Sequence, residues 1–186
     1  MGKKFTLKER LILSNQYDLL AKLSEDDDSQ KKHYENMSEI FRSGYSWGYG
    51  LATEPFSDEL DEDECRFVLD VLNMYSNLYY SRQNCNEAQS EIEERKVLFK
   101  GFDLNDSQEC KYLSFYRFLV EDFDRFNEFK SWIEEGKIEG FNSHGSGPSM
   151  EKLRRMLQKT KELNEIRFER HSRHFTKDEI EEILNA

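Results

Sequence analysis

Proline and glycine are scarce in this chain, with two and nine residues respectively among 186. Both residue types interrupt regular elements, so their scarcity favours long, uninterrupted secondary structure. The three cysteines (Cys65, Cys85 and Cys110) are odd in number, widely spaced and form no CxxC pair. This pattern does not indicate a disulfide framework, and we therefore expect a reducing, cytoplasmic location.

Long hydrophobic runs and excess positive charge are also missing. No apolar stretch approaches the ~20 residues of a membrane span, and the first residues lack the apolar core of a signal peptide. The 27 Lys and Arg residues are outnumbered by 38 Asp and Glu residues, which gives a net charge of −11. Since such a charge repels a phosphate backbone on average, neither a membrane nor a nucleic acid is the expected partner.

Aromatic residues and helix-start signals are abundant instead. Fourteen Phe and nine Tyr residues argue against disorder, because aromatic burial strongly favours a folded core. Pairs typical of capping boxes occur at Thr6/Glu9, Asp61/Glu64, Ser90/Glu93, Asp106/Glu109 and Thr176/Glu179. Apolar residues at helical spacing follow these signals, which predicts an all-α fold: a multihelical single domain of about seven to eight helices.

One predicted helix, Tyr112–Phe126, is apolar on nearly every side and is therefore expected to be the central helix. Within it, Arg117 is expected to pair with Glu121 one turn later. Further helices are expected over residues 28–43, ended by Gly44, after Pro148, and over residues 177–184.

The segment Tyr45–Leu51 alone has the period of a strand, because large residues alternate with Ser or Gly. We expect an extended aromatic loop that docks on a neighbour. Ser46 lies in a G-x-S-x-G pattern, so a hydrolase with Ser46 as nucleophile is one alternative. The strand that must precede such a nucleophile is not predicted here, which makes this alternative the least favoured.

The run RLILSNQY (Arg10–Tyr17) places two primary amides among apolar residues of a helix. At about 100° per residue, Asn15 and Gln16 fall inside one broad apolar arc, whereas Ser14 falls outside it. The arc comprises Leu11, Ile12, Leu13, Tyr17, Leu19, Leu20 and Leu23. A buried amide without partners costs roughly 1–3 kcal/mol, so these side chains are expected to meet backbone groups, a second subunit or a ligand.

The loop from Phe141 to Pro148 is polar and immediately precedes a predicted helix. Free backbone N–H groups at that position can hold an anion, but a capped connector between helices is the favoured interpretation of the loop. The loop lacks the GK[ST] end of a P-loop.

The segment from Glu151 to Lys177 contains nine Lys or Arg residues against four Glu. A solvated face is the usual meaning of such a run. The alternative is a nucleic-acid interface made by Lys152, Arg154, Arg155 and Lys159. His171 and His174 are suitably spaced for a metal, but the neighbouring arginines oppose a cation, so we expect neither a metal nor a cofactor.

Several segments together resemble the YfbU family of bacterial proteins. The matching segments are RLILSNQY (Arg10–Tyr17), Gly44-Tyr45, ECRFVLDVLNMY (Glu64–Tyr75), FKGFD (Phe99–Asp103), KYLSFYRFLVED (Lys111–Asp122), FNSH (Phe141–His144) and DEIEEILNA (Asp178–Ala186). The resemblance implies an all-α cytoplasmic protein without a catalytic signature. Fusion of similar domains to helix-turn-helix modules implies a ligand-binding role. The chain departs from the family pattern over residues 46–54 and 132–140.

We therefore expect a non-enzymatic, self-associating domain that binds a small ligand or a protein partner, most simply as a homo-oligomer. Aromatic and Arg side chains at a half-exposed loop are the usual anchors of such surfaces. The candidate ligand or interface residues are Asn15, Gln16, Tyr45, Trp47, Tyr49, Phe102, Asp103, Arg117, Asn142 and His144.

Overall fold

Side-chain caps determine where several helices begin. In the computed structural model, which describes residues 4–24 and 26–186, three helices begin at the capping boxes expected at Thr6, Asp61 and Thr176. In each box the N-cap side chain accepts from a backbone N–H three residues on, and the carboxylate there accepts from the N-cap N–H. The box expected at Ser90 is wrong, because this hydroxyl donates to the carbonyl of Glu87 from inside a helix.

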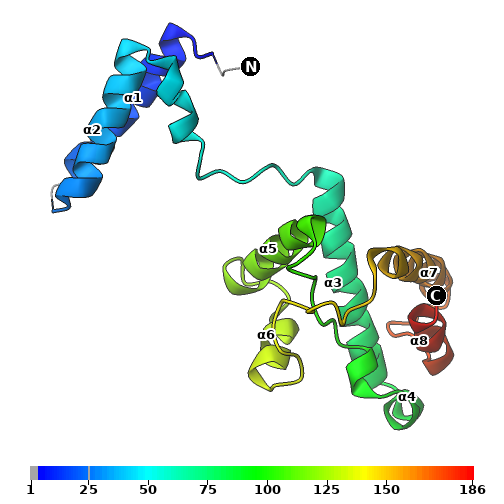
Figure 1. The fold of residues 1–186 in the computed structure, drawn as a ribbon. Coiled ribbons are helices and arrows are strands. Elements are labelled where there is room, and N and C mark those ends of the chain that lie inside the picture. Colours follow the sequence, from blue (N-terminus) through cyan, green and yellow to red (C-terminus); the bar gives the residue numbers. More distant parts are fainter. Residues whose placement is uncertain (1–3, 25) are drawn as a thin grey trace. The chain divides into compact units, whose positions relative to one another are not determined.

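The described residues form eight α-helices and two short 3₁₀-helices, without a strand, which confirms the all-α class. The α-helices are α1 (Leu7–Leu23), α2 (Asp28–Ser43), α3 (Glu62–Gln83), α4 (Asn86–Glu91), α5 (Ser107–Glu121), α6 (Asn127–Glu134), α7 (Met150–Glu169) and α8 (Lys177–Leu184) (Figure 1). The 3₁₀-helices are η1 (Ser46–Ala52) and η2 (Glu94–Lys96). None of the described helices combines the length and the apolar character needed to cross a membrane.

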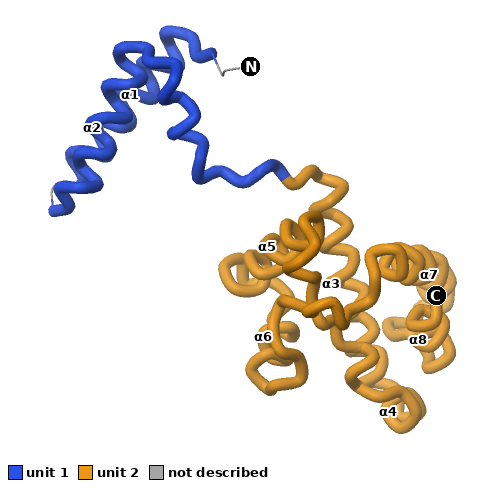
Figure 2. Tube along the Cα trace, in the orientation of Figure 1, with its two compact units in different colours: residues 1–59 blue, residues 60–186 orange. Residues whose placement is uncertain are grey.

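The chain divides into two compact units, residues 1–59 and residues 60–186 (Figure 2). The first unit is a helical hairpin of α1 and α2, on which η1 packs. Its small core consists of Met37, Phe41 and Tyr49, with Phe5 and Tyr17 packed against them. Gly44 ends α2 in the left-handed conformation, as expected.

The second unit is built around α3, which packs against α4, α5, α7 and α8. In Figure 1, α5 and α6 lie on one side of α3, and α7 and α8 lie on the other. The helix expected over Tyr112–Phe126 is therefore not the central one, and α3 takes that place. That helix, α5, ends at Glu121, and it exposes Phe118 to solvent. Seven side chains of α3 are buried, because it meets neighbours on more sides.

Two expectations for the first unit are wrong. Residues 46–52 form the 3₁₀-helix η1 rather than an extended arm. Short 3₁₀-helices are frequent after the end of an α-helix, here at Gly44. The packed face of α1 is also different: Ser14 and Ala21 are buried, whereas most of the predicted apolar arc is exposed. Small side chains permit a close approach of α2, and this approach determines which face of α1 is covered.

Candidate functional site

The structure brings four of the predicted site residues together in the second unit: Phe102, Asp103, Asn142 and His144. Phe102 donates its N–H to the Phe141 carbonyl (3.1 Å) and accepts from the Ser143 N–H (2.9 Å). This is an isolated parallel bridge between two loops that lie far apart in the sequence. The ring of Phe102 is fully buried, so it anchors the crossing and is not available to a ligand.

Asn142 holds the tip of the second loop. Its Oδ1 accepts from the backbone N–H groups of Leu104 (3.2 Å) and His144 (3.0 Å). Asp103 in turn accepts from the backbone and side chain of Asn105 (both 3.0 Å). The polar groups of Asn142 and Asp103 thus bind backbone and side-chain groups of the loops themselves, and their role is structural.

The other predicted residues lie elsewhere. Arg117 is exposed on α5 and pairs with Glu121, as expected. The remaining five, Asn15, Gln16, Tyr45, Trp47 and Tyr49, belong to the first unit. Of these, only Tyr49 is buried, where it stacks on Phe41 with ring centroids 5.3 Å apart. Asn15 lines a shallow pocket with Arg10 and Arg42.

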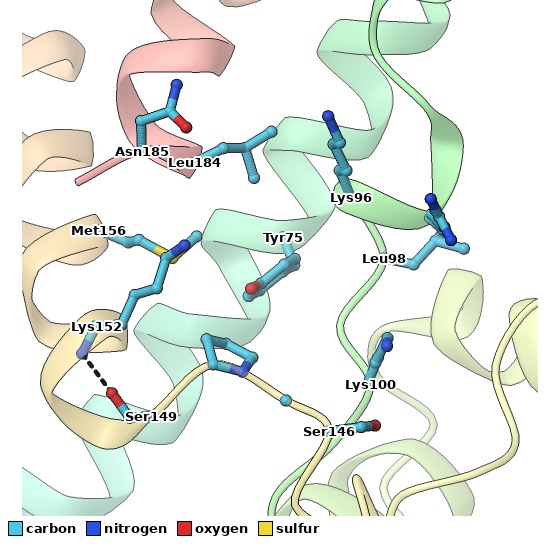
Figure 3. A pocket seen from close by; sticks show the side chains of 13 residues that line it. Tyr75, Lys96, Leu98, Lys100, Ser146, Ser149, Lys152, Met156, Leu184 and Asn185 are labelled. Carbon is cyan, nitrogen blue, oxygen red and sulfur yellow. Dashed lines mark hydrogen bonds between the residues drawn. The ribbon is translucent and has the colours of Figure 1, made fainter.

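The crossing of the two loops forms one wall of a pocket of about 590 Å³. The pocket lies between α3, the segment Arg95–Lys100, the start of α7 and the end of α8 (Figure 3). Apolar side chains line its interior: Tyr75, Leu98, Met156 and Leu184. In Figure 3 the Tyr75 ring lies between Lys152 and Lys100, which come from opposite sides. A cavity with apolar walls and a few polar groups is typical of a small-molecule site.

The charge of this lining is one-sided. Four basic side chains contribute to it (Arg95, Lys96, Lys100 and Lys152), and none of the described lining residues is acidic. Arg95 pairs with Glu93 outside the pocket at 2.5 Å. Within the described part of the chain, the three lysines have no carboxylate within salt-bridge distance. Unpaired cations that line one pocket create a local positive potential that attracts anions, even in a strongly acidic protein.

The start of α7 adds backbone donors to the same wall. Ser149 caps α7 by accepting from the Lys152 N–H at 3.2 Å, and Gly147 and Pro148 lead the chain into that cap. The first turn of a helix carries free N–H groups and the positive end of the macrodipole. This wall therefore contributes to anion attraction in the same sense as the lysines.

Tyr75 supplies a neutral polar group. Burial raises the pKa of Tyr75 well above its ordinary value of 10.0, so the phenol keeps its proton throughout the physiological range. A neutral phenol is both a donor and an acceptor of hydrogen bonds, and it does not repel an anion.

A second, smaller pocket of about 360 Å³ adjoins the first, and both are lined by Lys100 and Ser146. Asn142 and His144 line this second pocket. Its other cation, Lys137, is occupied by Glu94 and Glu135 at 3.4 and 2.9 Å. The hydrogen bond to Glu135 raises the pKa of Lys137, against the opposing effect of burial.

A family model described as the YfbU domain matches residues 3–186, which is essentially the whole chain. The chain belongs to the YfbU family. This confirms the resemblance drawn from its motifs, and the matched range includes both compact units.

Sequence reasoning missed most of the basic pocket of this YfbU domain. The sequence does not single out Arg95, Lys96 and Lys100, and it places Lys152 only in the alternative of a nucleic-acid face. The loop that precedes α7 was recognised as a possible anion site from its polarity and position. No pattern in the sequence indicates that residues near position 96 lie beside that loop.

The proposed nucleic-acid face is partly neutralised by neighbouring carboxylates. Arg155 pairs with Glu151 (3.2 Å), and Lys159 pairs with Glu162 (3.1 Å) and Glu182 (4.0 Å). Arg154 lies over the Phe67 ring, 5.8 Å from its centroid. Because phosphate binding depends on cations free to replace counterions, these contacts weaken the case for a phosphate-backbone surface.

A serine hydrolase and a metal centre receive little support from the structure. Ser46 begins η1 directly after α2, so the strand-to-helix turn of a nucleophile elbow is not formed there. Among the described residues, no three His, Cys, Asp or Glu side chains are grouped closely enough to hold a metal ion.

Proposed function

We propose that this YfbU domain is a binding protein that takes a small organic anion into the basic pocket. The observation that carries the proposal is the composition of the lining: four cations and no described carboxylate. The apolar residues Leu98, Met156 and Leu184 suit a ligand with a carbon skeleton.

The energetics favour an anion with more than one negative charge. Each hydrogen bond to a charged group contributes about 1.5–3 kcal/mol, so three lysine contacts contribute about 4.5–9 kcal/mol, which corresponds to an affinity between roughly millimolar and micromolar. The lysines are partly in contact with solvent, so the interaction is expected to weaken as salt screens it.

The polar groups of the pocket support binding rather than catalysis. The Ser146 hydroxyl donates to the Ser143 carbonyl (2.7 Å), and the Ser149 hydroxyl caps α7. Both hydroxyls thus hold the loop in place, and no described lining residue is a His, Asp, Glu or Cys that could act as a base beside them. We accordingly propose a non-enzymatic role.

We also propose a cytoplasmic location. All three cysteines are half-buried free thiols, and a reducing compartment keeps such thiols from oxidation.

The test is a calorimetric titration of the full chain with inorganic phosphate, pyrophosphate and citrate, at about 50 mM salt. We expect pyrophosphate or citrate to bind and to raise the melting temperature through linkage. Lys100→Ala and Lys152→Ala should each weaken binding by about 10-fold to 100-fold, which corresponds to one lost charged contact.

Lys161→Ala is the matched control, because Lys161 is exposed on the same helix and lies outside the pocket. This variant should bind as the parent does. Binding of none of the three anions at millimolar concentration, or equal weakening by Lys161→Ala, would contradict the proposal.

A further inference from the structure

The hydroxyl of Tyr75 is a polar group on a buried side chain that opens onto the basic pocket. The side chain is only 4% exposed, and its ring packs on the buried ring of Phe99 with centroids 5.0 Å apart. In the part of the chain that the structure describes, this hydroxyl has no hydrogen-bond partner. Figure 3 shows its oxygen on the side of the pocket where Lys152 and Ser149 lie. Because buried hydroxyls are normally hydrogen-bonded, the pocket has a place for an acceptor at this point.

Tyr116 shows why the position of Tyr75 matters. The Tyr116 hydroxyl also has no partner among the described residues, but it is sealed in the core and does not line the pocket. The Tyr75 side chain does line the pocket, so a ligand can reach its hydroxyl. Burial raises the pKa of Tyr75, and the hydroxyl therefore keeps a proton to donate.

The connector that precedes α7 adds backbone donors beside this hydroxyl. The Ser146 N–H donates to a carbonyl within the loop (2.9 Å), and the Lys152 N–H donates to the Ser149 hydroxyl (3.2 Å). The N–H groups of Gly147 and Ser149, by contrast, meet no acceptor within the described ranges, and both residues line the pocket. Free N–H groups at the start of a helix are typical donors to oxyanions.

Two lysines supply positive charge on opposite sides of the Tyr75 ring. Lys152 is half-buried on the first turn of α7, and Lys100 is exposed beside the loop crossing. The Tyr75 ring lies between them in Figure 3. Two lysines that are free of carboxylates can balance a group with two negative charges, and an ammonium group is a common partner of phosphate.

These donors fit a phosphoryl group better than a carboxylate. They come from three elements, namely α3, the connector to α7 and the segment that ends at Lys100. A carboxylate accepts hydrogen bonds mainly in its own plane. A phosphate monoester has three terminal oxygens that point in three directions, and it carries a charge of about −1.5 to −2 at pH 7.

On the basis of the anion-binding function proposed above, we propose that the ligand is a small phosphate monoester whose phosphoryl group binds between Tyr75 and the start of α7. The Tyr75 hydroxyl donates to one phosphoryl oxygen and thereby determines specificity. The N–H groups of Gly147 and Ser149 donate to the others, and the Lys152 ammonium balances the charge. The organic part then lies against the apolar lining, in a pocket of about 590 Å³ that is large enough for a small molecule.

The first experiment compares three probes by calorimetric titration of the full chain: phenyl phosphate, benzoate and inorganic phosphate. Phenyl phosphate should bind at least about 10-fold more tightly than benzoate, because benzoate has a single charge and two acceptor oxygens. It should also bind at least about 10-fold more tightly than inorganic phosphate, because its ring buries apolar surface against the lining.

The second experiment removes the hydroxyl alone. Tyr75→Phe should weaken the binding of phenyl phosphate by about 10-fold to 100-fold, which corresponds to one lost hydrogen bond to a charged group. The melting temperature of the unliganded variant should not fall, because the ring keeps its contact with Phe99. Tyr116→Phe is the matched control, since it removes the same atom from a buried phenol outside the pocket. This control should bind phenyl phosphate as the parent does.

The outcomes separate the ligand class from the anion-binding function. Binding of citrate that Lys100→Ala weakens, with phenyl phosphate no tighter than benzoate, would leave the function standing and overturn the phosphate monoester. Unchanged affinity for phenyl phosphate in Tyr75→Phe would overturn the role of the hydroxyl. Binding to phosphatidylcholine vesicles that contain phosphatidic acid, without binding of phenyl phosphate, would assign the site to a lipid and overturn the small ligand. Binding of none of these anions would overturn both proposals.

Discussion

The α-carbon of Gly101 lies so close to Phe141 that a Cβ at residue 101 would come within 1.9 Å of the Phe141 carbonyl oxygen. The same oxygen accepts the hydrogen bond from the Phe102 N–H, so the two loops are in contact through their backbones. Gly101 also has a positive φ of 100°. Only glycine meets both conditions, and the position of Lys100 in the pocket depends on it.

Gly101→Ala is therefore expected to destabilise the fold by more than about 2 kcal/mol, since backbone strain and a backbone clash add. The variant should also lose anion binding. Urea denaturation gives the free energy of unfolding. Gly136→Ala separates the two causes, because Gly136 has a positive φ of 69° but no atom near its Cβ position. Its cost should be about 1–2 kcal/mol, from the backbone strain alone. Equal costs for both variants would contradict the clash.

Ser81→Ala should show how much one buried hydrogen bond contributes to the free energy of unfolding. The Ser81 hydroxyl accepts from the Phe175 N–H at 2.9 Å, and both residues are buried. Loss of the hydroxyl leaves that N–H without a partner, at an expected cost of about 1–3 kcal/mol in the free energy of unfolding. Ser114→Ala, at an exposed helix position, should change stability by less than about 0.5 kcal/mol. A neutral Ser81→Ala variant would show that the N–H finds another acceptor.

Tyr116→Phe is expected to preserve or raise stability. Tyr116 is fully buried, and its hydroxyl has no hydrogen-bond partner among the described residues. Burial raises the pKa of this phenol well above its ordinary value, so it remains neutral. Since removal of an unsatisfied hydroxyl removes a desolvation penalty, a gain of up to about 1 kcal/mol should appear in thermal unfolding. A loss greater than this would mean that the hydroxyl is satisfied, for example by a buried water molecule.

Glu179 should make the docking of α8 sensitive to acid. Burial acts to raise its pKa, but hydrogen bonds from Thr176 and Arg170 outweigh this effect, and the net pKa lies below the ordinary 4.5. A lowered folded-state pKa stabilises the fold above the unfolded value, and this contribution is lost as the pH falls below about 4.5. Glu179→Gln should show a smaller loss of melting temperature between pH 6 and pH 3 than the parent. Identical pH profiles would contradict this role.

The sequence was sufficient to predict the fold class and most helix boundaries, because caps are local. Thr6, Asp61 and Thr176 begin helices through contacts only three residues long, and Gly44 ends α2 through its own backbone conformation. The capping box predicted at Ser90 is wrong because the Ser90 hydroxyl lies inside a helix and donates to the Glu87 carbonyl one turn back. The Ser90/Glu93 spacing therefore does not mark a helix start here.

The faces on which the helices pack could not be predicted in the same way. Periodicity predicts an apolar arc on α1, but the side chains of α1 that are buried are those of the small residues Ser14 and Ala21, and of the arc only Leu13 and Tyr17 pack on the core of this unit. Likewise, α5 is rich in aromatic residues on several sides, yet α3 has more neighbours. Both outcomes depend on which helices approach each other, and the hydrophobic pattern of one helix contains no information on that choice.

The candidate site was the least predictable feature. Its cations come from the segment near Lys96, from Lys100 beside the loop crossing and from Lys152 on α7. In its local sequence, each of these residues has the pattern of an ordinary surface lysine or arginine. Their common environment depends on the crossing of Phe102 and Asn142 and on the packing of α7 and α8 against α3, which are contacts between distant segments.

The positions of the pocket residues along the chain determine when the pocket can form during synthesis. Tyr75 lies in the first half of the chain, whereas Leu184 and Asn185 follow more than half a chain length later. Since a nascent chain emerges from the ribosome in sequence order, α3 can form long before α8 is available to close the pocket. Until then, Tyr75 and Met156 lack the cover that Leu184 provides. The complete pocket, with Leu184 and Asn185 in place, therefore forms only after translation has passed residue 185, and the anion binding proposed above would report completed folding of this unit.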